Sequence, residues 1–193
     1  SRELKAQGKD IISLSLGEPD FNTPQFIKDA AVVGLEQNFT TYTPVSGYDD
    51  LRERISHKFM RDNGLNYPKE QIVVSTGAKQ SIANVVLSLI NPGDEVIIPA
   101  PYWVSYIEIV KMAGGIPVVI HAGIDQDFKI NATQFEAAIT PKTKLFIFSS
   151  PCNPTGSVYT KEELRGLADV LVKHPDLIAL SDEIYEHIRF EGE

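Results

Sequence analysis

The sequence contains one cysteine, one tryptophan and no long apolar run. A single cysteine, Cys152, excludes an intrachain disulfide and a cysteine-based metal cluster, and it fits a reducing compartment, so we expect a cytoplasmic protein. Because no stretch of about 18 apolar residues occurs, the sequence predicts no membrane-spanning helix. The four histidines show no metal-ligand spacing: His57, His121, His174 and His187.

Basic residues are fewer than acidic ones. Lysines and arginines number 18 against 26 aspartates and glutamates, which gives a formal net charge of −8 at pH 7. A nucleic-acid binder would normally show a basic stripe, so the balance argues against a nucleic-acid partner. The 193 residues, 42% of them hydrophobic, suffice for one domain, or for one large domain with part of another.

Apolar runs alternate with segments of helical spacing in the larger part of the chain. Five short runs have the character of buried strands: 72–74, 96–98, 116–120, 145–148 and 177–180. Four intervening segments have helical character: 78–90, 103–113, 133–139 and 161–173. This alternation predicts βαβ units, a largely parallel sheet and helices on both of its faces.

The first 64 residues follow a different pattern. Residues 11–16 form a short extended segment, and Thr23-Pro24 predicts the start of a helix that runs to about Leu35, with Thr23 as its cap. After loop-like residues 36–47, a second helix is expected over 49–63, ended by glycine. We expect a boundary near residues 40–47 between an N-terminal segment and the repeating α/β region.

Residues 75–80 join a predicted strand to a predicted helix and read Ser-Thr-Gly-Ala-Lys-Gln. Small residues there leave backbone N–H groups open at a helix N-terminus, which is an anion site. The alternative is an ordinary helix capped by threonine. An unrelated doubly wound nucleotide binder would carry a glycine-rich fingerprint at this point, and the segment lacks it.

Four polar or aromatic residues follow other predicted strands. Asp182 could pair with a protonated ring nitrogen, or cap a following helix. Asn153 and Tyr185 could each hydrogen-bond a phenolate oxygen on the same ring, or serve as a turn residue and a helix residue. Trp103 could stack on a planar cofactor or pack in the core.

The order and spacing of six segments resemble the fold-type I pyridoxal-phosphate aminotransferases, most nearly their bacterial aspartate aminotransferase branch. The segments are Ser15–Phe21, Tyr42–Gly47, Ser75–Gln80, Pro101–Tyr106, Asn153–Gly156 and Ser181–Tyr185. The likeness covers essentially the whole chain. Its most specific part is Asn-Pro-Thr-Gly followed by Asp-Glu-Ile-Tyr.

The resemblance implies an α/β three-layer sandwich with a largely parallel sheet, of the type found in the large domain of these transferases. Residues 1–45 would be an N-terminal arm and small-domain segment, and residues 46–193 part of the large domain that binds pyridoxal 5'-phosphate. The family is homodimeric, with active sites shared between subunits, and its substrates are amino acids and 2-oxo acids.

It also implies roles around the cofactor ring. Asp182 would hold the ring nitrogen protonated, and Trp103 would stack on the ring and border the substrate. Asn153 and Tyr185 would both bond the ring's O3', and Asn153 would also touch the substrate carboxylate.

Other residues would serve the phosphate and the substrate. Gly77, Ala78 and Lys79 would sit at the cofactor phosphate, mostly through their backbone. Tyr42 would reach the phosphate of the partner subunit. Gly17 would contact the substrate carboxylate through its backbone; from the residues alone it could equally make a turn, and Tyr42 could be a surface aromatic.

The implied reaction transfers an amino group from an amino acid, with aspartate as the leading donor, to a 2-oxo acid. The family's Schiff-base lysine and its carboxylate-binding arginine lie beyond Tyr185, and the chain contains neither. Lys79 matches the phosphate loop instead, so we assign no catalytic residue and expect the chain alone to be inactive. The alternative is a non-catalytic pyridoxal-phosphate-binding or regulatory protein.

Two strands that follow Asp-Glu-Ile-Tyr in the family insert into its sheet. We expect them to flank residues 72–74 and 145–148, so that the sheet of this chain has a gap or unpaired buried edges. The fold is therefore expected to be incomplete, as part of a larger enzyme.

Overall fold

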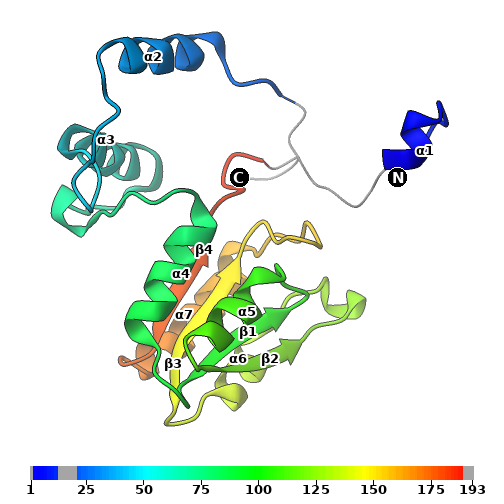
Figure 1. Cartoon of the computed structure of the whole chain (residues 1–193). Coiled ribbons are helices and arrows are strands. Elements are labelled where there is room, and N and C mark those ends of the chain that lie inside the picture. The colour runs from blue at the N-terminus through cyan, green and yellow to red at the C-terminus, as the bar shows by residue number, and fades with distance from the viewer. Residues whose placement is uncertain (1, 13–20, 189–193) are drawn as a thin grey trace. The chain divides into compact units, whose positions relative to one another are not determined.

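The computed structural model describes residues 2–12 and 21–188 (Figure 1). The chain divides into two compact units, Ser1–Pro44 and Val45–Glu193, each of which is described by itself. The assignment of the first unit to a small domain and of the second to a large cofactor-binding domain stays a prediction.

The first unit contains α1 (Arg2–Ala6) and α2 (Gln25–Glu36). The predicted helix is present, but the predicted Thr23 cap is wrong: α2 begins after Pro24, and no side chain caps it. The cause is the backbone of Pro24, whose ψ of 142° is extended and so excludes the residue from the first turn. No side chain of α2 is buried. Residues 13–16 of the expected extended segment lie outside the described residues.

The second unit opens with α3 (Asp49–Lys58), which continues as a π-helical turn, η1 (Phe59–Asn63). Gly64 follows with a φ of +66°, a left-handed conformation that glycine adopts without strain, so the helix predicted over 49–63 and its glycine end are confirmed. A 3₁₀ turn, η2 (Lys69–Gln71), leads on to the sheet and its helices.

Four parallel strands form the sheet in the order β2-β1-β3-β4. They are β1 (Glu95–Ala100), β2 (Ile116–His121), β3 (Thr143–Ser149) and β4 (Ile178–Asp182). The parallel α/β sheet predicted from the alternating pattern is thereby confirmed. Because every strand runs the same way, their carboxyl ends meet at one edge of the sheet.

Helices cover both faces, which makes three layers (Figure 1). On one face lie α4 (Ala78–Leu89) and α5 (Ser105–Met112), and Val86 and Val110 pack there against Val96 of β1. On the other lie α6 (Ala132–Ala138) and α7 (Lys161–Lys173), where Phe135 packs on Phe146 with ring centroids 4.3 Å apart. The side chains of these five residues are all fully buried or nearly so.

Capping fixes where two of these helices start. In α6, Asn131 accepts a hydrogen bond from Gln134 N, and the side chain of Gln134 accepts one from Asn131 N, so the helix begins one residue earlier than its apolar spacing predicts. Thr160 and Glu163 form the same capping box at α7. A short 3₁₀ turn, η3 (Ile124–Gln126), lies between β2 and α6.

The prediction of a strand at residues 72–74 is wrong. Ile72 is extended and buried, but Val74 N donates to Ser46 O at 3.0 Å, and these residues join no strand of the described sheet. A strand requires a neighbour on which to form its ladder, and the described residues provide none at this point. Only Ile72 of the run is buried, and Val73 is 62% exposed, so neither the burial nor the pairing expected of this strand is present in the described residues.

The expected position of the gap is also wrong. β3 is paired on both sides, with β1 through Phe146↔Ile97 and with β4 through Phe148↔Ser181. Since the crossover through α7 joins neighbouring strands, β4 closes that side of β3. Within the described ranges, the outer edges of β4 and of β2 pair with no strand, because these two strands end the sheet.

We expect the 193-residue chain, expressed alone, to self-associate or to unfold without a sharp transition. An unpaired β4 edge exposes a row of backbone donors and acceptors, beside Ile178, whose side chain is 44% exposed. Size-exclusion chromatography with light scattering and thermal melting would measure this. A monomer of 21.4 kDa that melts cooperatively would contradict it.

Candidate active site

The N-terminus of α4 has no side-chain cap. Gly77 occupies the cap position with a φ of +86° and a ψ of 162°, a backbone conformation open to glycine and strained for other residues. Its carbonyl accepts the N–H groups of Gln80 and Ser81. Within the part of the chain that the structure describes, the N–H groups of Ala78 and Lys79 have no acceptor. The threonine-capped alternative is therefore not what the structure has, and the helix end can receive an anion.

Asp182 ends β4 as a buried carboxylate, 9% exposed. Its Oδ2 accepts a hydrogen bond from the hydroxyl of Tyr106 at 2.7 Å, and its Oδ1 accepts one from Ile184 N at 3.2 Å. The residue after β4 begins a turn rather than a helix, so Asp182 is not a helix cap in the described residues. A buried carboxylate requires such partners, because desolvation penalises its charge.

Tyr106 is a site residue that the sequence analysis did not select. It lies on α5 and is 2% exposed. Burial raises the pKa of its phenol, and the hydrogen bond to the Asp182 carboxylate raises it further, so the hydroxyl stays a donor. Tyr106 follows Trp103 by three residues, about one helical turn. The same spacing fits an apolar core residue of the helix, so Tyr106 did not stand out in the sequence.

Asn153 and Tyr185 meet directly. Asn153 Nδ2 donates to the hydroxyl oxygen of Tyr185 at 3.1 Å, across 32 residues of sequence. Asn153 lies in a turn in which Cys152 N donates to Ser157 O and Gly156 N donates to Cys152 O, at 3.0 and 2.7 Å. Tyr185 lies in the turn after β4, not in a helix.

The turn that carries Tyr185 is anchored through its neighbour, Glu186. Lys58 Nζ and Asn63 Nδ2 donate to the two carboxylate oxygens of Glu186 at 2.5 and 2.6 Å. Those hydrogen bonds, from Lys58 first and Asn63 second, lower the pKa of Glu186. Lys58 ends α3 and Asn63 ends η1, so the π-helical turn brings both donors to this carboxylate.

Trp103 lies between β1 and α5, 37% exposed, and belongs to neither core cluster. The ammonium of Lys79, on the first turn of α4, is 5.6 Å from the centroid of its ring. This cation–π contact brings Trp103 close to the predicted phosphate-binding segment 75–80. An accessible aromatic surface therefore lies beside the N-terminus of α4.

The site residues of the second unit therefore gather at the carboxyl edge of the sheet. Ser149 of β3 is paired with Asp182 of β4, so the two strands end side by side. A cavity of about 280 Å³ is lined both by Ala78, in the first turn of α4, and by Asp182, at the end of β4. Tyr42 belongs to the first unit, with a fully exposed side chain, and Gly17 lies outside the described residues.

The donor set suits a planar, phosphorylated, basic heterocycle. Open amides of a helix N-terminus attract a phosphate, a carboxylate attracts a protonated ring nitrogen, and an amide beside a phenol matches a ring oxygen. Among the described residues, no three or more histidines, cysteines, aspartates or glutamates group as a metal site would require. No helix of residues 2–12 and 21–188 combines the length and apolarity needed to cross a membrane.

A parallel α/β sheet with this site at its carboxyl edge is typical of enzymes that bind a phosphorylated ring cofactor. The chain belongs to the aminotransferase class I and II family, whose model matches residues 9–193. The resemblance seen in the sequence is thereby confirmed at the level of the family.

Relatives of known name agree with this family. The chain is 54% identical over 190 residues to the aspartate/prephenate aminotransferase of Nitrosomonas europaea, covering 98% of the chain and 48% of that protein. It is 51% identical over 193 residues to the aspartate aminotransferase of Geobacillus stearothermophilus, covering 100% and 49%. The crystal structure of the Rhizobium meliloti aspartate aminotransferase matches with a TM-score of 0.94 and 43% identity, over 100% and 48% of the two chains. The chain thus spans about half the length of these relatives.

We expect two of the seven tyrosines, Tyr106 and Tyr159, to stay protonated at a pH at which an ordinary phenol ionises. Burial raises the pKa of Tyr159 to about 12, and it raises the pKa of Tyr106 beyond that of an ordinary phenol, about 10. Their contribution to the free energy of unfolding is therefore complete below about pH 10 and is lost as the pH rises through the folded-state pKa values. Alkaline titration of tyrosinate absorbance, repeated on Tyr159→Phe, measures this. A single transition for all tyrosines near pH 10 would contradict it.

Proposed function

We propose that the chain is part of a pyridoxal 5'-phosphate-dependent aminotransferase that transfers an amino group from an amino acid to a 2-oxo acid. The observation that carries the proposal is that Ala78, in the uncapped first turn of α4, and Asp182, at the end of β4, line the same cavity. Membership of the aminotransferase family supports it.

We propose that the cofactor phosphate binds the N-terminus of α4. The N–H groups of Ala78 and Lys79 would donate to it, and Gly77, which has no side chain, leaves the approach clear. Lys79 would add a positive charge while its ammonium lies near the ring of Trp103. The helix dipole acts in the same direction as these donors.

Asp182 would bind the pyridine nitrogen and keep it protonated. When bound, pyridoxal phosphate acts as an electron sink for the charge that develops at the substrate's α-carbon. Tyr106 donates to Oδ2 of Asp182 and Ile184 N donates to Oδ1, which leaves lone pairs on the carboxylate that would accept the proton of the ring nitrogen. Trp103 would stack on the ring and border the substrate, as its exposed aromatic surface permits.

Asn153 and Tyr185 would both contact the ring's O3'. Their direct hydrogen bond of 3.1 Å keeps the Asn153 amide and the Tyr185 phenol close together. Two groups that both hydrogen-bond one ring oxygen must lie this close. Asn153 and the backbone of Gly17 would also contact the substrate carboxylate.

Aspartate is the amino donor that we propose, because relatives 50–54% identical to the chain are named aspartate or aspartate/prephenate aminotransferases. The second name adds prephenate as a substrate of those relatives. We propose that the lysine that moves the substrate's α-proton comes from sequence beyond these 193 residues, as the length of the relatives suggests.

We further propose a cytoplasmic homodimer with shared active sites. Tyr42, with its fully exposed side chain, would reach the phosphate bound by the partner subunit. The exposed apolar side chains of α2, such as Phe26 and Leu35, are consistent with a surface that another chain covers.

We expect the complete gene product to retain pyridoxal phosphate covalently after borohydride reduction, and the 193-residue chain to lose it on dialysis. A lysine–cofactor bond can be reduced to a stable amine, whereas contacts from Asp182 and the α4 amides are reversible. Mass spectrometry and absorbance of the treated proteins measure this. Reversible binding by the complete product would favour a non-catalytic pyridoxal-phosphate-binding or regulatory protein instead.

We expect Asp182→Asn in the complete gene product to lower kcat for aspartate transamination by about 10²–10³-fold, with a smaller change in KM, because the cation on the ring is needed in the transition state. Asp182→Glu should lose less. Asp176→Asn is the matched control, because Asp176 is exposed and precedes β4 at the opposite end of that strand. Equal activity of Asp182→Asn and the control would refute the role assigned to Asp182.

A further inference from the structure

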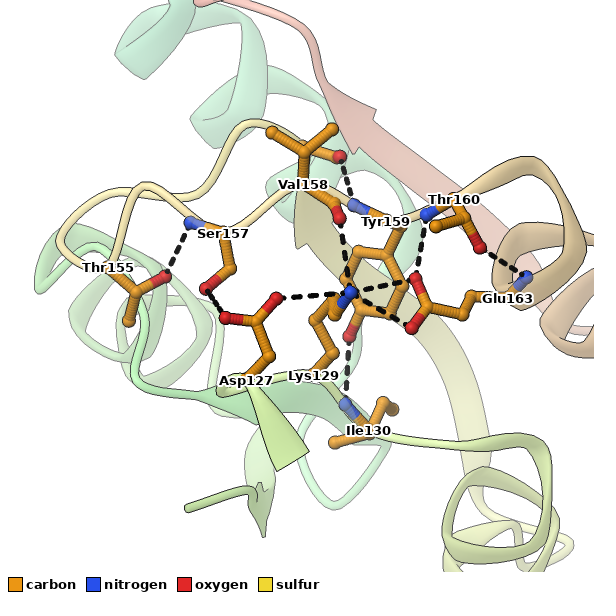
Figure 2. Close-up of polar contacts among 10 residues, drawn as sticks. Asp127, Lys129, Ile130, Thr155, Ser157, Val158, Tyr159, Thr160 and Glu163 are labelled. Carbon is orange, nitrogen blue, oxygen red and sulfur yellow. Dashed lines mark hydrogen bonds and ion pairs between the residues drawn. The ribbon is translucent and has the colours of Figure 1, made fainter. Parts of the chain in front are cut away.

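A mixed-charge cluster joins the segment between η3 and α6 to residues 155–160 and to α7 (Figure 2). At its centre is Lys129, whose side chain is 11% exposed. The two preceding residues, Asp127 and Phe128, have φ values of +51° and +57°, a left-handed backbone that is uncommon for residues other than glycine. This segment is therefore held in place by contacts outside its own backbone.

Lys129 has acceptors on every side. Its Nζ is 2.9 Å from both carboxylate oxygens of Glu163 and 3.1 Å from Oδ2 of Asp127, and it donates to Val158 O at 3.3 Å. An ammonium has three protons to donate, so these acceptors saturate it. Two carboxylates and a carbonyl from three segments thus converge on one cation, as Figure 2 shows.

The contacts continue from Lys129 into the loop 150–160. Glu163 Oε2 also accepts from Thr160 N at 2.7 Å, which ties the end of the loop to α7. Ile130 N donates to the hydroxyl of Tyr159 at 3.0 Å, and Tyr159 N donates to Ser150 Oγ at 3.0 Å. The loop is therefore fixed at its base by the segment that carries Lys129.

From this base, hydrogen bonds lead to Asn153. Ser157 N donates to Thr155 Oγ1 at 3.2 Å, and Ser157 O accepts from Cys152 N at 3.0 Å. Ser157 is next to Val158, whose carbonyl Lys129 binds. Asn153 lies inside the turn that these bonds close, so its side chain can contact Tyr185 only while the turn keeps this shape.

We propose that Lys129 is a positioning residue for Asn153: its ammonium clamps the loop 150–160, so that the Asn153 amide is presented to the cofactor's ring oxygen. The inference rests on the proposed function, because it assumes that Asn153 contacts that oxygen. Loss of the ammonium leaves Asp127 and Glu163 as unneutralised like charges and deprives Val158 O of a donor, and both changes open the loop.

The test uses Lys129→Met, which keeps the aliphatic stem and removes the charge, with Lys129→Arg as the conservative variant. Lys173→Met is the matched control, because Lys173 likewise forms a 2.9 Å pair with a glutamate, Glu136, but this pair joins α7 to α6 and does not touch the loop. Glu163→Gln is the second variant should Lys129→Met fail to fold, since glutamine preserves the capping box.

The first measurement is hydrogen exchange at the amides of Cys152 and Gly156 in the complete gene product without cofactor. We expect Lys129→Met to exchange about tenfold faster at both, as the loss of one charged hydrogen bond predicts, and Lys129→Arg and Lys173→Met to match the parent. Unchanged exchange in Lys129→Met would overturn the clamp.

The second measurement is the pH midpoint of the absorbance of bound pyridoxal phosphate. An amide that donates to the ring oxygen stabilises its anionic form, so Asn153→Ala should raise the midpoint by about one pH unit. Lys129→Met should raise it by a smaller amount in the same direction, Lys129→Arg should restore it, and Lys173→Met should leave it unchanged.

The outcomes separate this inference from the proposed function. Faster exchange with an unchanged midpoint in Lys129→Met would reduce Lys129 to a stabiliser of the loop and overturn the positioning role alone. If the parent shows no cofactor absorbance, or Asn153→Ala leaves the midpoint unchanged, the role of Asn153 fails, and the positioning role of Lys129 fails with it.

Discussion

The parallel pairing of β3 with β4 is the constraint on which the candidate site depends. Because Ser149 is paired with Asp182, the loop that carries Asn153 and the turn that carries Tyr185 leave the sheet side by side. The buried carboxylate of Asp182 needs a hydrogen-bond donor, because an unpaired buried charge is unfavourable. The phenol of Tyr106, on helix α5 that covers the sheet, is that donor. The sheet, through β4, and the helix layer, through α5, thus fix the carboxylate of Asp182 between them.

Much of the fold follows from local sequence. The runs around Val96, Ile116, Phe146 and Leu180 became strands, and capping residues such as Asn131 set the helix starts to within a residue. Pairing did not follow from local sequence, because a strand exists only relative to a neighbour. The apolar run beginning at Ile72 has none in the described residues, and β3 turned out to be enclosed on both sides where a gap was expected.

For the site, the sequence indicated residues and the structure adds their contacts. The motifs identified Asn153, Asp182 and Tyr185 because their residue types follow strand ends. Tyr106 escaped notice because its helical spacing is that of a core residue, and it is indeed in the core, with only its hydroxyl serving the site. Lys129 gave no signal, since Glu163, which it contacts, lies 34 residues away and depends on the crossover through α7.

The segments that carry Asn153 and Tyr185 are held in the same way, by a lysine–carboxylate pair, and the position of the site at the strand ends explains why. Apart from Tyr159, which packs in the core, the loop that carries Asn153 and the turn that carries Tyr185 contribute none of their described residues to the buried hydrophobic core, so burial of hydrophobic surface stabilises them little. Each is instead fixed by a lysine that binds a carboxylate: Lys129 with Glu163 on one side, and Lys58 with Glu186 on the other. The side chains of these pairs are 11–38% exposed, so they avoid the full desolvation penalty of the interior and are still partly shielded from water. The neutral contact between Asn153 and Tyr185 can then remain the part of the site that a ligand rearranges, while the charged pairs hold the backbone on which both side chains stand.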